Sequence, residues 1–306
     1  MENPTESASL TEVADDVYAY VQPPGGWCVS NAGVVAGGDG ALVVDTLATQ
    51  RRAERLRASV DALGIGPRRT VVNTHHHGDH TFNNHVFGAA AEVIAHERAV
   101  AELDETGLAL TALWPDVEWG DVRVARPTLT FADRIALRVG EQHMEVFHIG
   151  PAHTTNDIVV WLPGPRVLFA GDVVLSGCTP FALMGSVSGS LAAIERLRGL
   201  GARTVVCGHG PVAGPEVFEE NAAYLRRVQD IAATGTAEGW SPLRAAREAG
   251  PGEFGRWLDP ERLVGNLHRA YAELTPGATP GAALDVPPVF GEMVAYNGGK
   301  LPGCAA

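Results

Sequence analysis

The sequence contains no long apolar run. No stretch approaches the roughly 18 to 20 consecutive apolar residues that a membrane-spanning helix requires. Residues 1–12 are polar and acidic, whereas a secretory signal begins with basic residues followed by an apolar segment. We therefore expect a protein that does not associate with membranes and that resides in the cytoplasm.

Positive charge and cysteine are both scarce. Lys and Arg number 23 against 36 Asp and Glu, which leaves a net charge of −13 at pH 7. So acidic a chain is not expected to bind nucleic acid or anionic membrane surfaces in general. The four cysteines (Cys28, Cys178, Cys207 and Cys304) lie far apart and include no C-x-x-C pair. This spacing fits neither a disulfide framework nor a zinc knuckle, so we expect reduced, buried thiols.

The composition is that of a globular protein built from both strands and helices. Of the 306 residues, 45% are hydrophobic, which suffices for a sizeable core. Short β-type runs alternate with segments of helical periodicity, which predicts an α/β fold with mixed sheets. Strands are predicted at residues 17–21, 29–36, 41–45, 70–73, 128–131, 134–139, 143–148, 158–163, 167–172 and 204–210. Helices are predicted at residues 49–63, 96–108 and 190–201, the last with Ser190 as its N-cap.

The pattern of predicted elements changes near residue 215, where alternating strands and helices give way to helices alone. Helical segments at residues 216–233, 241–249 and 260–274 are followed by a tail rich in Pro and Gly. We therefore predict a main domain over residues 10–215 and a helical C-terminal extension over residues 216–306 that packs on it.

Metal-ligand residue types concentrate in the segment THHHGDH. In an extended segment, His75 and His77 project from the same side and His76 projects from the other. Asp79 continues this alternation, and the glycine before it allows His80 to swing round at the start of a helix. One short segment can thus offer two imidazoles to one metal ion, and a carboxylate plus an imidazole to a second. Imidazole and carboxylate suit Zn²⁺, with Mn²⁺ and Fe as alternatives.

Three further residues of ligand type each follow an apolar strand: His153, Asp172 and His209. Open α/β sheets gather their ligands at the carboxyl ends of their strands. A single histidine in such a place is usually a hydrogen-bonded structural residue. Together with the THHHGDH segment, however, these residues make seven candidate ligands, which is enough for two metal ions that share a carboxylate and a bridging water.

This set resembles the ligand set of the metallo-beta-lactamase superfamily, over the stretch from about Val13 to Pro215. The resemblance implies an αββα sandwich, in which two mixed sheets lie face to face with helices outside and metal ions at one edge. It also implies that His75, His77 and His153 hold the first Zn²⁺, that Asp79, His80 and His209 hold the second, and that Asp172 bridges them. Asp79 and Asp172 are the implied catalytic carboxylates. For His76, a packing role and a role behind the ligands stay equally open.

The residue at the bridging position narrows the subclass. Several true β-lactamases of the superfamily carry Cys or Ser there, whereas an aspartate such as Asp172 is more typical of the lactonase, thioesterase and glyoxalase branches. Some members of those branches place a carbonyl-polarising tyrosine three residues later, where this sequence has Leu175. The difference disfavours a plain quorum-lactone hydrolase.

Aromatic and apolar residues in the flanking segments predict the kind of substrate. By resemblance, residues 23–33 and the loop 171–189 lie beside the metal ions, and residues 108–115 form a lid. The candidate substrate-binding residues in these segments and in the tail 294–302 are Trp27, Asn31, Trp114, Phe181, Met184 and Tyr296. Each aromatic residue taken singly is more often a core residue, but together they indicate an apolar pocket.

The same stretches resemble cyclase-thioesterases of the actinorhodin type, which act in bacterial aromatic polyketide biosynthesis. That resemblance implies aldol closure of the second ring, release of the product from an acyl carrier protein by thioester hydrolysis, and a homodimer. The arginines of the predicted helix 49–63 (Arg51, Arg52, Arg55 and Arg57) are candidates for contacting an acidic carrier.

Two other functions stay open from the sequence. One is a glyoxalase II-like or lactonase-like hydrolase of lactones or thioesters, and the other is an iron enzyme such as a persulfide dioxygenase. The metal ligands alone do not choose among these reactions, because two ions can both activate water and stabilise negative charge on a substrate oxygen.

Overall fold

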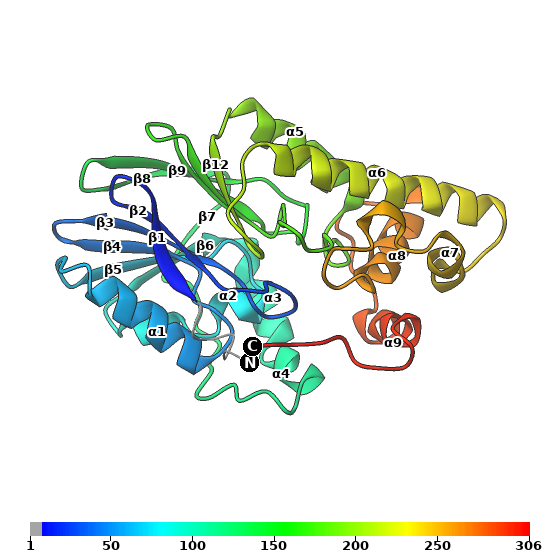
Figure 1. Ribbon diagram of the computed structural model, residues 1–306, viewed down its shortest axis with the longest axis horizontal. Coiled ribbons are helices and arrows are strands. Elements are labelled where there is room, and N and C mark those ends of the chain that lie inside the picture. Colours follow the sequence, from blue (N-terminus) through cyan, green and yellow to red (C-terminus); the bar gives the residue numbers. More distant parts are fainter. Residues whose placement is uncertain (1–7) are drawn as a thin grey trace.

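Two β-sheets lie face to face in the middle of the molecule, and helices cover their outer faces (Figure 1). The computed structural model describes residues 8–306. Within this range the first sheet has seven strands and the second has five, and each sheet combines parallel and antiparallel neighbours. The predicted αββα sandwich of two mixed sheets is thus confirmed.

The first sheet is antiparallel on one side and parallel on the other. In order across the sheet, its strands are β1 (Ser9–Ala14), β2 (Val17–Val21), β3 (Ala32–Gly37), β4 (Gly40–Val44), β5 (Arg68–Val72), β6 (Glu92–His96) and β7 (Leu129–Phe131). Neighbours from β1 to β4 are antiparallel, and neighbours from β4 to β7 are parallel. Because parallel strands end at the same edge of a sheet, the loops after β4 and β5 lie together.

The second sheet places three of its strand ends at one edge. In order across the sheet, its strands are β12 (Thr204–Cys207), β11 (Val167–Gly171), β10 (Ile158–Leu162), β9 (Gln142–His148) and β8 (Arg134–Val139). β12 and β11 are parallel, whereas the remaining neighbours are antiparallel. β9, β11 and β12 therefore run in the same direction, so the loops that follow them share an edge.

The central strands of the first sheet contribute side chains to two hydrophobic layers, one on each face of the sheet. Val35 and Val72 face the second sheet, where they pack in one cluster with Phe169. Their chain neighbours Val34 and Val71 face the opposite way, towards α1 (Gln50–Asp61). The residues of α1 in that outer layer are Ala53, Leu56 and Val60. Successive side chains of a strand point to opposite faces, so these short valine-rich runs are buried on both sides.

The arginines of α1, which were predicted as candidates for contacting an acidic carrier, differ in their surroundings. Arg52 is buried, donates to Gln22 Oε1 at 2.7 Å and also donates to the carbonyl of Ala305. Arg57 pairs with Asp61 at 3.5 Å on the helix surface. Arg52 therefore has a structural role, and because it is buried it does not offer its charge to a carrier protein.

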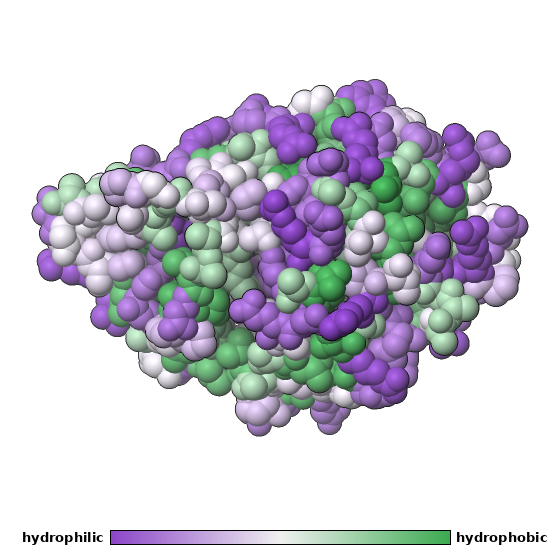
Figure 2. Space-filling view, turned by 180° about the vertical axis from the view of Figure 1, so that it is seen from behind, coloured by the Kyte–Doolittle hydropathy of each residue, from purple (hydrophilic) through white to green (hydrophobic). Residues whose placement is uncertain are grey.

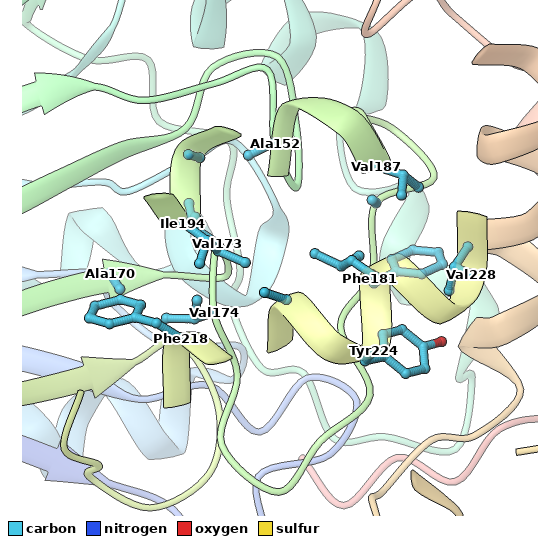
Figure 3. Close-up of a cluster of buried hydrophobic side chains, with 14 of the residues drawn as sticks. Ala152, Ala170, Val173, Val174, Phe181, Val187, Ile194, Phe218, Tyr224 and Val228 are labelled. Atoms are coloured by element: carbon cyan, nitrogen blue, oxygen red, sulfur yellow. The ribbon is translucent and has the colours of Figure 1, made fainter. Parts of the chain in front are cut away.

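The C-terminal helices share a core with the second sheet. That sheet is covered by α5 (Val187–Gly199) and α6 (Glu216–Ala237), and α6 continues beyond it (Figure 1). α7 (Pro242–Ala249) and α8 (Arg262–Leu274) pack against α6, and α9 (Val286–Tyr296) packs against α7 and α8. Figure 3 shows Phe181, from the loop after β11, near Tyr224 and Val228 of α6. A single hydrophobic cluster runs through the second sheet, this loop and the helices.

Some element predictions need correction. The predicted helix 96–108 is the end of β6 followed by α3 (Arg98–Thr106). α5 begins at Val187, and its N-cap is Ser186 rather than Ser190, because Ser186 Oγ accepts from the Gly189 amide at 2.8 Å. The Pro- and Gly-rich tail contains α9, which has proline in its first turn, a position that tolerates a missing amide proton. The remaining short helices are α2 (Gly78–Thr81), η2 (Asn84–Phe87), α4 (Ala109–Leu113) and η3 (Gly252–Phe254).

In residues 8–306, few large hydrophobic side chains are exposed, and these lie far apart in the sequence. Figure 2 shows a face whose rim is largely hydrophilic, with hydrophobic residues along its lower edge and near its centre. The large hydrophobic side chains that stay exposed are Leu108, Leu129, Leu274 and Leu301. In residues 8–306, no helix has both the length and the apolar character that crossing a membrane requires.

Candidate metal centre

Four loops bring the candidate ligands to one edge of the sandwich. The segment after β5 carries His75 to His80, the loop after β9 carries His153, Asp172 follows β11, and His209 follows β12. All of these strands end at the same edge. The sequence predicted this convergence, and the structure brings all seven side chains together.

The first group consists of His75, His77 and His153. One nitrogen from each ring lies within 4.8 Å of the other two. His77 Nδ1 is 3.1 Å from His75 Nε2 and 2.9 Å from His153 Nε2. Three imidazole nitrogens thus point at a common centre, which is the arrangement expected of a three-histidine metal site.

The second group consists of Asp79, His80 and His209, and Asp172 lies between the two groups. His209 Nε2 is 3.4 Å from Asp79 Oδ2. Asp172 Oδ2 is 3.3 Å from His209 Nε2 and 3.5 Å from His153 Nε2. Asp172 Oδ1 is 3.3 Å from His80 Nε2. One carboxylate therefore contacts imidazoles of both groups, as a bridging ligand must.

The ring nitrogens on the far side of these histidines are already occupied. Nδ1 of His209 lies 3.0 Å from the carbonyl oxygen of Gly25, and Nδ1 of His153 lies against the carbonyl of Phe181. His80 Nδ1 is 2.8 Å from Asp45 Oδ2. Because a carbonyl or carboxylate lies against Nδ1 of each of these rings, each ring directs its Nε2 at the centre, and Nε2 is the nitrogen that would bind a metal ion.

Asp45 is a site residue that the sequence reasoning missed. It follows β4 with a φ of 63°, and its Oδ1 accepts from the Thr74 amide at 2.8 Å. Its Oδ2 accepts from the Thr74 hydroxyl at 2.7 Å and contacts His80. The signal in the sequence was an aspartate directly after an apolar strand, the same pattern that drew attention to Asp172.

The electrostatics of the centre fit divalent cations. Burial lowers the pKa values of His75 and His77 well below the usual range, and neighbouring imidazoles lower them further. Burial alone would raise the pKa of Asp172, but the imidazoles around it lower that pKa well below its usual range. Nε2 of His80 and Oδ1 of Asp172 lie 3.3 Å apart and are buried, but within residues 8–306 neither atom forms a hydrogen bond. In the second group the neighbouring carboxylates outweigh burial, so that they raise the pKa of His80 well above its usual range and that of His209 to about 9. A metal ion bound there would take the place of these protons between the imidazoles and the carboxylates.

His76 turns away from both groups. Its Nδ1 lies 2.9 Å from Asn156 Nδ2 and 3.2 Å from Glu102 Oε2 of α3. Burial lowers the pKa of His76 to about 3. Since Glu102 also accepts from the Thr155 hydroxyl, His76 connects the ligand segment to α3 and to the loop that carries His153. The alternation argument placed His76 correctly on the opposite side from its neighbours.

A pocket of about 600 Å³ opens over the centre. Its floor includes His77, Asp79, His153, Asp172 and His209. Its walls are mostly apolar and come from the loop before β3, from α4, from the loop after β11 and from the C-terminal extension. The apolar and aromatic residues among the walls include Trp27, Phe82, Leu113, Phe181, Met184 and Phe290.

Three predicted substrate residues do not line this pocket. Asn31 is buried, and its amide donates to the carbonyls of Cys207 at 2.9 Å and Gly210 at 2.7 Å, so it braces the loop that carries His209. Trp114 is buried behind the wall, with its indole N–H donating to the Pro302 carbonyl at 2.8 Å. Tyr296, on α9, packs against the hydrophobic cluster of the second sheet and helices. These three predictions are corrected to structural roles, whereas Trp27, Phe181 and Met184 border the pocket.

The family is decided by a sequence comparison. Residues 25–209, more than half of the chain, match the model of the metallo-beta-lactamase superfamily. The chain belongs to the metallo-beta-lactamase superfamily. The matched stretch contains all seven candidate ligands, whereas α6 to α9 lie beyond it.

Curated relatives from this superfamily carry more than one activity in their names. The chain is 25% identical over 227 residues to a metallo-beta-lactamase type 2 of Bacteroides fragilis, which covers 70% of this chain and 84% of that protein. It is 28% identical over 253 residues to a hydroxyacylglutathione hydrolase of Xanthomonas euvesicatoria pv. vesicatoria, which covers 79% of this chain and 87% of that protein. Sequence identities this low do not determine which reaction the chain catalyses, so the reaction has to be inferred from the residues of the site.

Solved structures repeat the same fold. A metallo-beta-lactamase family protein from Thermus thermophilus superposes with a TM-score of 0.65 at 22% identity, covering 86% of this chain and 93% of the other. A metallo-beta-lactamase from Pontibacter korlensis superposes with a TM-score of 0.60 at 23% identity, covering 72% of this chain and 99% of the other. At these identities the likeness speaks for the fold alone.

Proposed function

We propose that the protein is a metal-dependent hydrolase that cleaves a thioester or lactone bond in a substrate with a bulky, apolar acyl group. The observation that carries this proposal is the convergence of two groups of candidate ligands around Asp172, at the floor of an apolar pocket of about 600 Å³. Membership of the metallo-beta-lactamase superfamily supports metal-dependent hydrolysis as the reaction class.

The seven candidate ligands divide into the two groups already described, with Asp172 shared. Zn²⁺ is the expected metal and Mn²⁺ or Fe the alternatives, because imidazole and carboxylate suit all three. When bound, the metal pair would lower the pKa of a water molecule and polarise the carbonyl oxygen of the substrate. Asp79 and Asp172 border the pocket, which supports our proposal that their carboxylates orient the attacking water. The apolar walls exclude other water from the reacting carbonyl.

The shape and chemistry of the pocket support a large acyl group. A volume of about 600 Å³ lies within the range of about 300–1,000 Å³ typical of pockets for small organic ligands. Many of its residues are apolar or aromatic, among them Trp27, Phe82, Leu113, Phe181, Met184 and Phe290. A small polar acyl group would leave these walls unfilled. The hydroxyacylglutathione hydrolases among the relatives support thioester cleavage as the chemistry.

A second candidate function is cyclisation and release of an aromatic polyketide. The observation that favours it is the aromatic wall around Trp27, which offers a surface for flat, partly cyclised substrates. In that case an aldol closure would precede thioester hydrolysis, and the thiol would belong to an acyl carrier protein. Arg51 and Arg57 stay as surface positions on α1 for an acidic carrier.

The hydrolase proposal is tested by metal removal and by substitution of the shared carboxylate. The protein stripped with a chelator should lose hydrolysis of a thioester mimic and regain it when Zn²⁺ is added back. Asp172→Ala should lose more than about 100-fold in kcat/KM and bind fewer equivalents of zinc by elemental analysis. Asp230→Ala, which removes an exposed aspartate of α6, is the matched control and should behave as wild type. Full turnover by Asp172→Ala would overturn the shared-carboxylate site.

A linear poly-β-keto thioester of N-acetylcysteamine separates the two candidate functions. Release of the open-chain acid supports hydrolysis alone, whereas release of a ring-closed product supports the cyclase. The products are distinguished by mass spectrometry, because aldol closure with dehydration removes one water from the acid.

A further inference from the structure

Trp27 is held from the C-terminal extension by two consecutive residues. Its indole N–H donates to Glu261 Oε1 at 2.7 Å. The guanidinium carbon of Arg262 lies 4.1 Å from the centre of the indole ring. Glu261 is 3% exposed and Arg262 is 2% exposed, so neither contact is a surface contact. Both residues lie beyond the stretch that matches the family, so the hold on Trp27 is a feature of the extension.

Arg262 is fixed in turn by the loop that follows the bridging aspartate. It pairs with Asp259 at 2.9 Å and donates to the Thr179 carbonyl at 3.0 Å. The same two segments exchange backbone hydrogen bonds, from the Thr179 amide to the Leu258 carbonyl at 3.0 Å and from the Leu258 amide to the Gly177 carbonyl at 3.0 Å. The start of α8 is therefore tied to the loop 173–185, and the position of Trp27 is tied to both.

Other aromatic rings also pack against Trp27. Its ring centre lies 5.3 Å from that of Phe181, 5.7 Å from that of Trp114 and 6.4 Å from that of Phe290. Trp27 is partly exposed, and it lines the pocket together with the candidate ligands His153 and His209. A fixed indole thus lines the same pocket as the candidate metal ligands.

We infer that Glu261 and Arg262 are positioning residues that fix Trp27 as an aromatic platform, and that this platform selects acyl groups carrying flat, unsaturated rings over saturated ones. The inference rests on the proposed thioester hydrolysis. A ring in a substrate that packs on an indole gains an interaction beyond buried area, worth about 2- to 12-fold in affinity. That gain is retained only if the indole is already ordered, because ordering a free side chain on binding offsets it.

The test compares two thioesters of N-acetylcysteamine, 2-naphthylacetyl and decahydro-2-naphthylacetyl. They share a carbon skeleton, and a methylene separates the carbonyl from the ring, so their intrinsic reactivities are matched. Zinc-loaded wild type should favour the naphthyl ester in kcat/KM. Glu261→Leu, which removes the acceptor of the indole N–H, should raise KM for the naphthyl ester about 2- to 12-fold more than KM for the saturated ester.

Two further variants keep the result specific. Glu261→Gln retains an oxygen that can accept the indole N–H and should restore most of the preference. Glu253→Leu removes an exposed glutamate of the extension and should leave the ratio of the two KM values as in wild type. A wild type without preference, or a Glu261→Leu variant that weakens both esters equally, would overturn the inference even if the hydrolysis itself is confirmed.

Failure of the proposed function would give a different result from failure of the platform. If zinc-loaded wild type cleaves neither ester, the hydrolase proposal fails, and the platform is then tested by binding alone. Calorimetry with thioether analogues, in which a methylene replaces the carbonyl, gives the dissociation constants of the flat and saturated rings. A preference for the flat ring that Glu261→Leu abolishes and Glu261→Gln retains upholds the platform, and equal binding of both rings refutes it.

Discussion

Asp45 sets the orientation of a candidate ligand without belonging to the ligand set. Its carboxylate accepts the Thr74 amide and hydroxyl and contacts His80 Nδ1 at 2.8 Å. The Thr74 hydroxyl in turn lies 3.1 Å from His75 Nδ1. A single buried carboxylate therefore orients imidazoles assigned to both metal positions, which is the usual role of residues behind metal ligands.

Asp45→Asn should weaken metal binding while leaving the fold intact. The amide keeps the shape of the side chain but no longer offers two anionic acceptors, so His80 loses its charged partner. We expect an affinity for Zn²⁺ lower by about 10- to 100-fold, measured by competition with a chromophoric chelator. Asp39→Asn, at an exposed position before β4, is the control and should bind zinc as wild type does. If Asp45→Asn binds Zn²⁺ as tightly as wild type, Asp45 does not support metal binding through His80.

At the residue scale, the sequence predicted the unusual cluster of histidines and aspartates, but it did not predict buried contacts between residues that lie far apart in the chain. The candidate ligands were recognised because three histidines and an aspartate at this spacing are typical of a metal site. Asn31 was predicted to bind substrate, whereas its amide donates to the carbonyls of Cys207 and Gly210. These partners lie far along the chain, so the local sequence does not indicate them. Glu261 and Arg262 were missed for the same reason: their contacts with Trp27 exist only after α8 has packed.

At the scale of elements, a pair of stacked imidazoles joins the two sheets. His96 ends β6 and His148 ends β9, and their ring centres are 4.0 Å apart at an interplanar angle of 15°. His96 Nε2 donates to the Ala132 carbonyl at 2.7 Å, and its Nδ1 accepts from the Arg98 amide at 3.3 Å. His148 Nε2 donates to the Thr155 carbonyl at 3.1 Å. Burial lowers the pKa of both rings, so the folded protein holds them neutral.

Acid should therefore weaken the junction between the sheets. The folded-state pKa values are depressed, so the stability that these rings contribute is present above the unfolded pKa of about 6.5 and is lost as the pH falls through the folded values. The double variant His96→Gln, His148→Gln should show a shallower loss of unfolding free energy between pH 7.5 and pH 5, measured with urea on zinc-loaded protein. His143→Gln, at an exposed position of β9, should keep the wild-type slope. An identical slope in the double variant would contradict the assignment.

Element boundaries show where local signals suffice. β2, β4 and α1 were predicted within a residue or two, because valine-rich runs and helical spacing are local patterns. Ser190 was predicted as the N-cap of α5, but Ser186 takes that role, because its Oγ accepts from the Gly189 amide. α9 was missed because prolines and glycines around residues 276–288 suggested a loop, whereas its first turn accommodates proline.

At the scale of the whole molecule, the extension is part of the core that supports the site. Phe218, Leu225 and Val228 of α6 are buried in the same cluster as Val174 and Leu183 of the loop after β11. Asn221 of α6 also donates to the Leu175 carbonyl at 2.8 Å and accepts from its amide at 3.0 Å. The sequence predicted a helical extension, but its periodicity could not reveal that the loop after Asp172 depends on it for burial.

A chain that ends at residue 215 should therefore fail to fold on its own. Removing α6 to α9 exposes the cluster formed by the second sheet and the loop after β11, and burial of this kind supplies most of the stability of a domain. We expect an aggregating or expanded protein, with no cooperative unfolding transition by circular dichroism and strong binding of a hydrophobic dye. A chain ending at residue 296 keeps the four helices and loses only the tail that bonds to Trp114 and Arg52, so it should unfold cooperatively at a lower temperature than the full chain. A soluble, cooperatively folding 1–215 chain that binds two equivalents of zinc would mean that the matched region is an independent domain and that the extension serves the substrate alone.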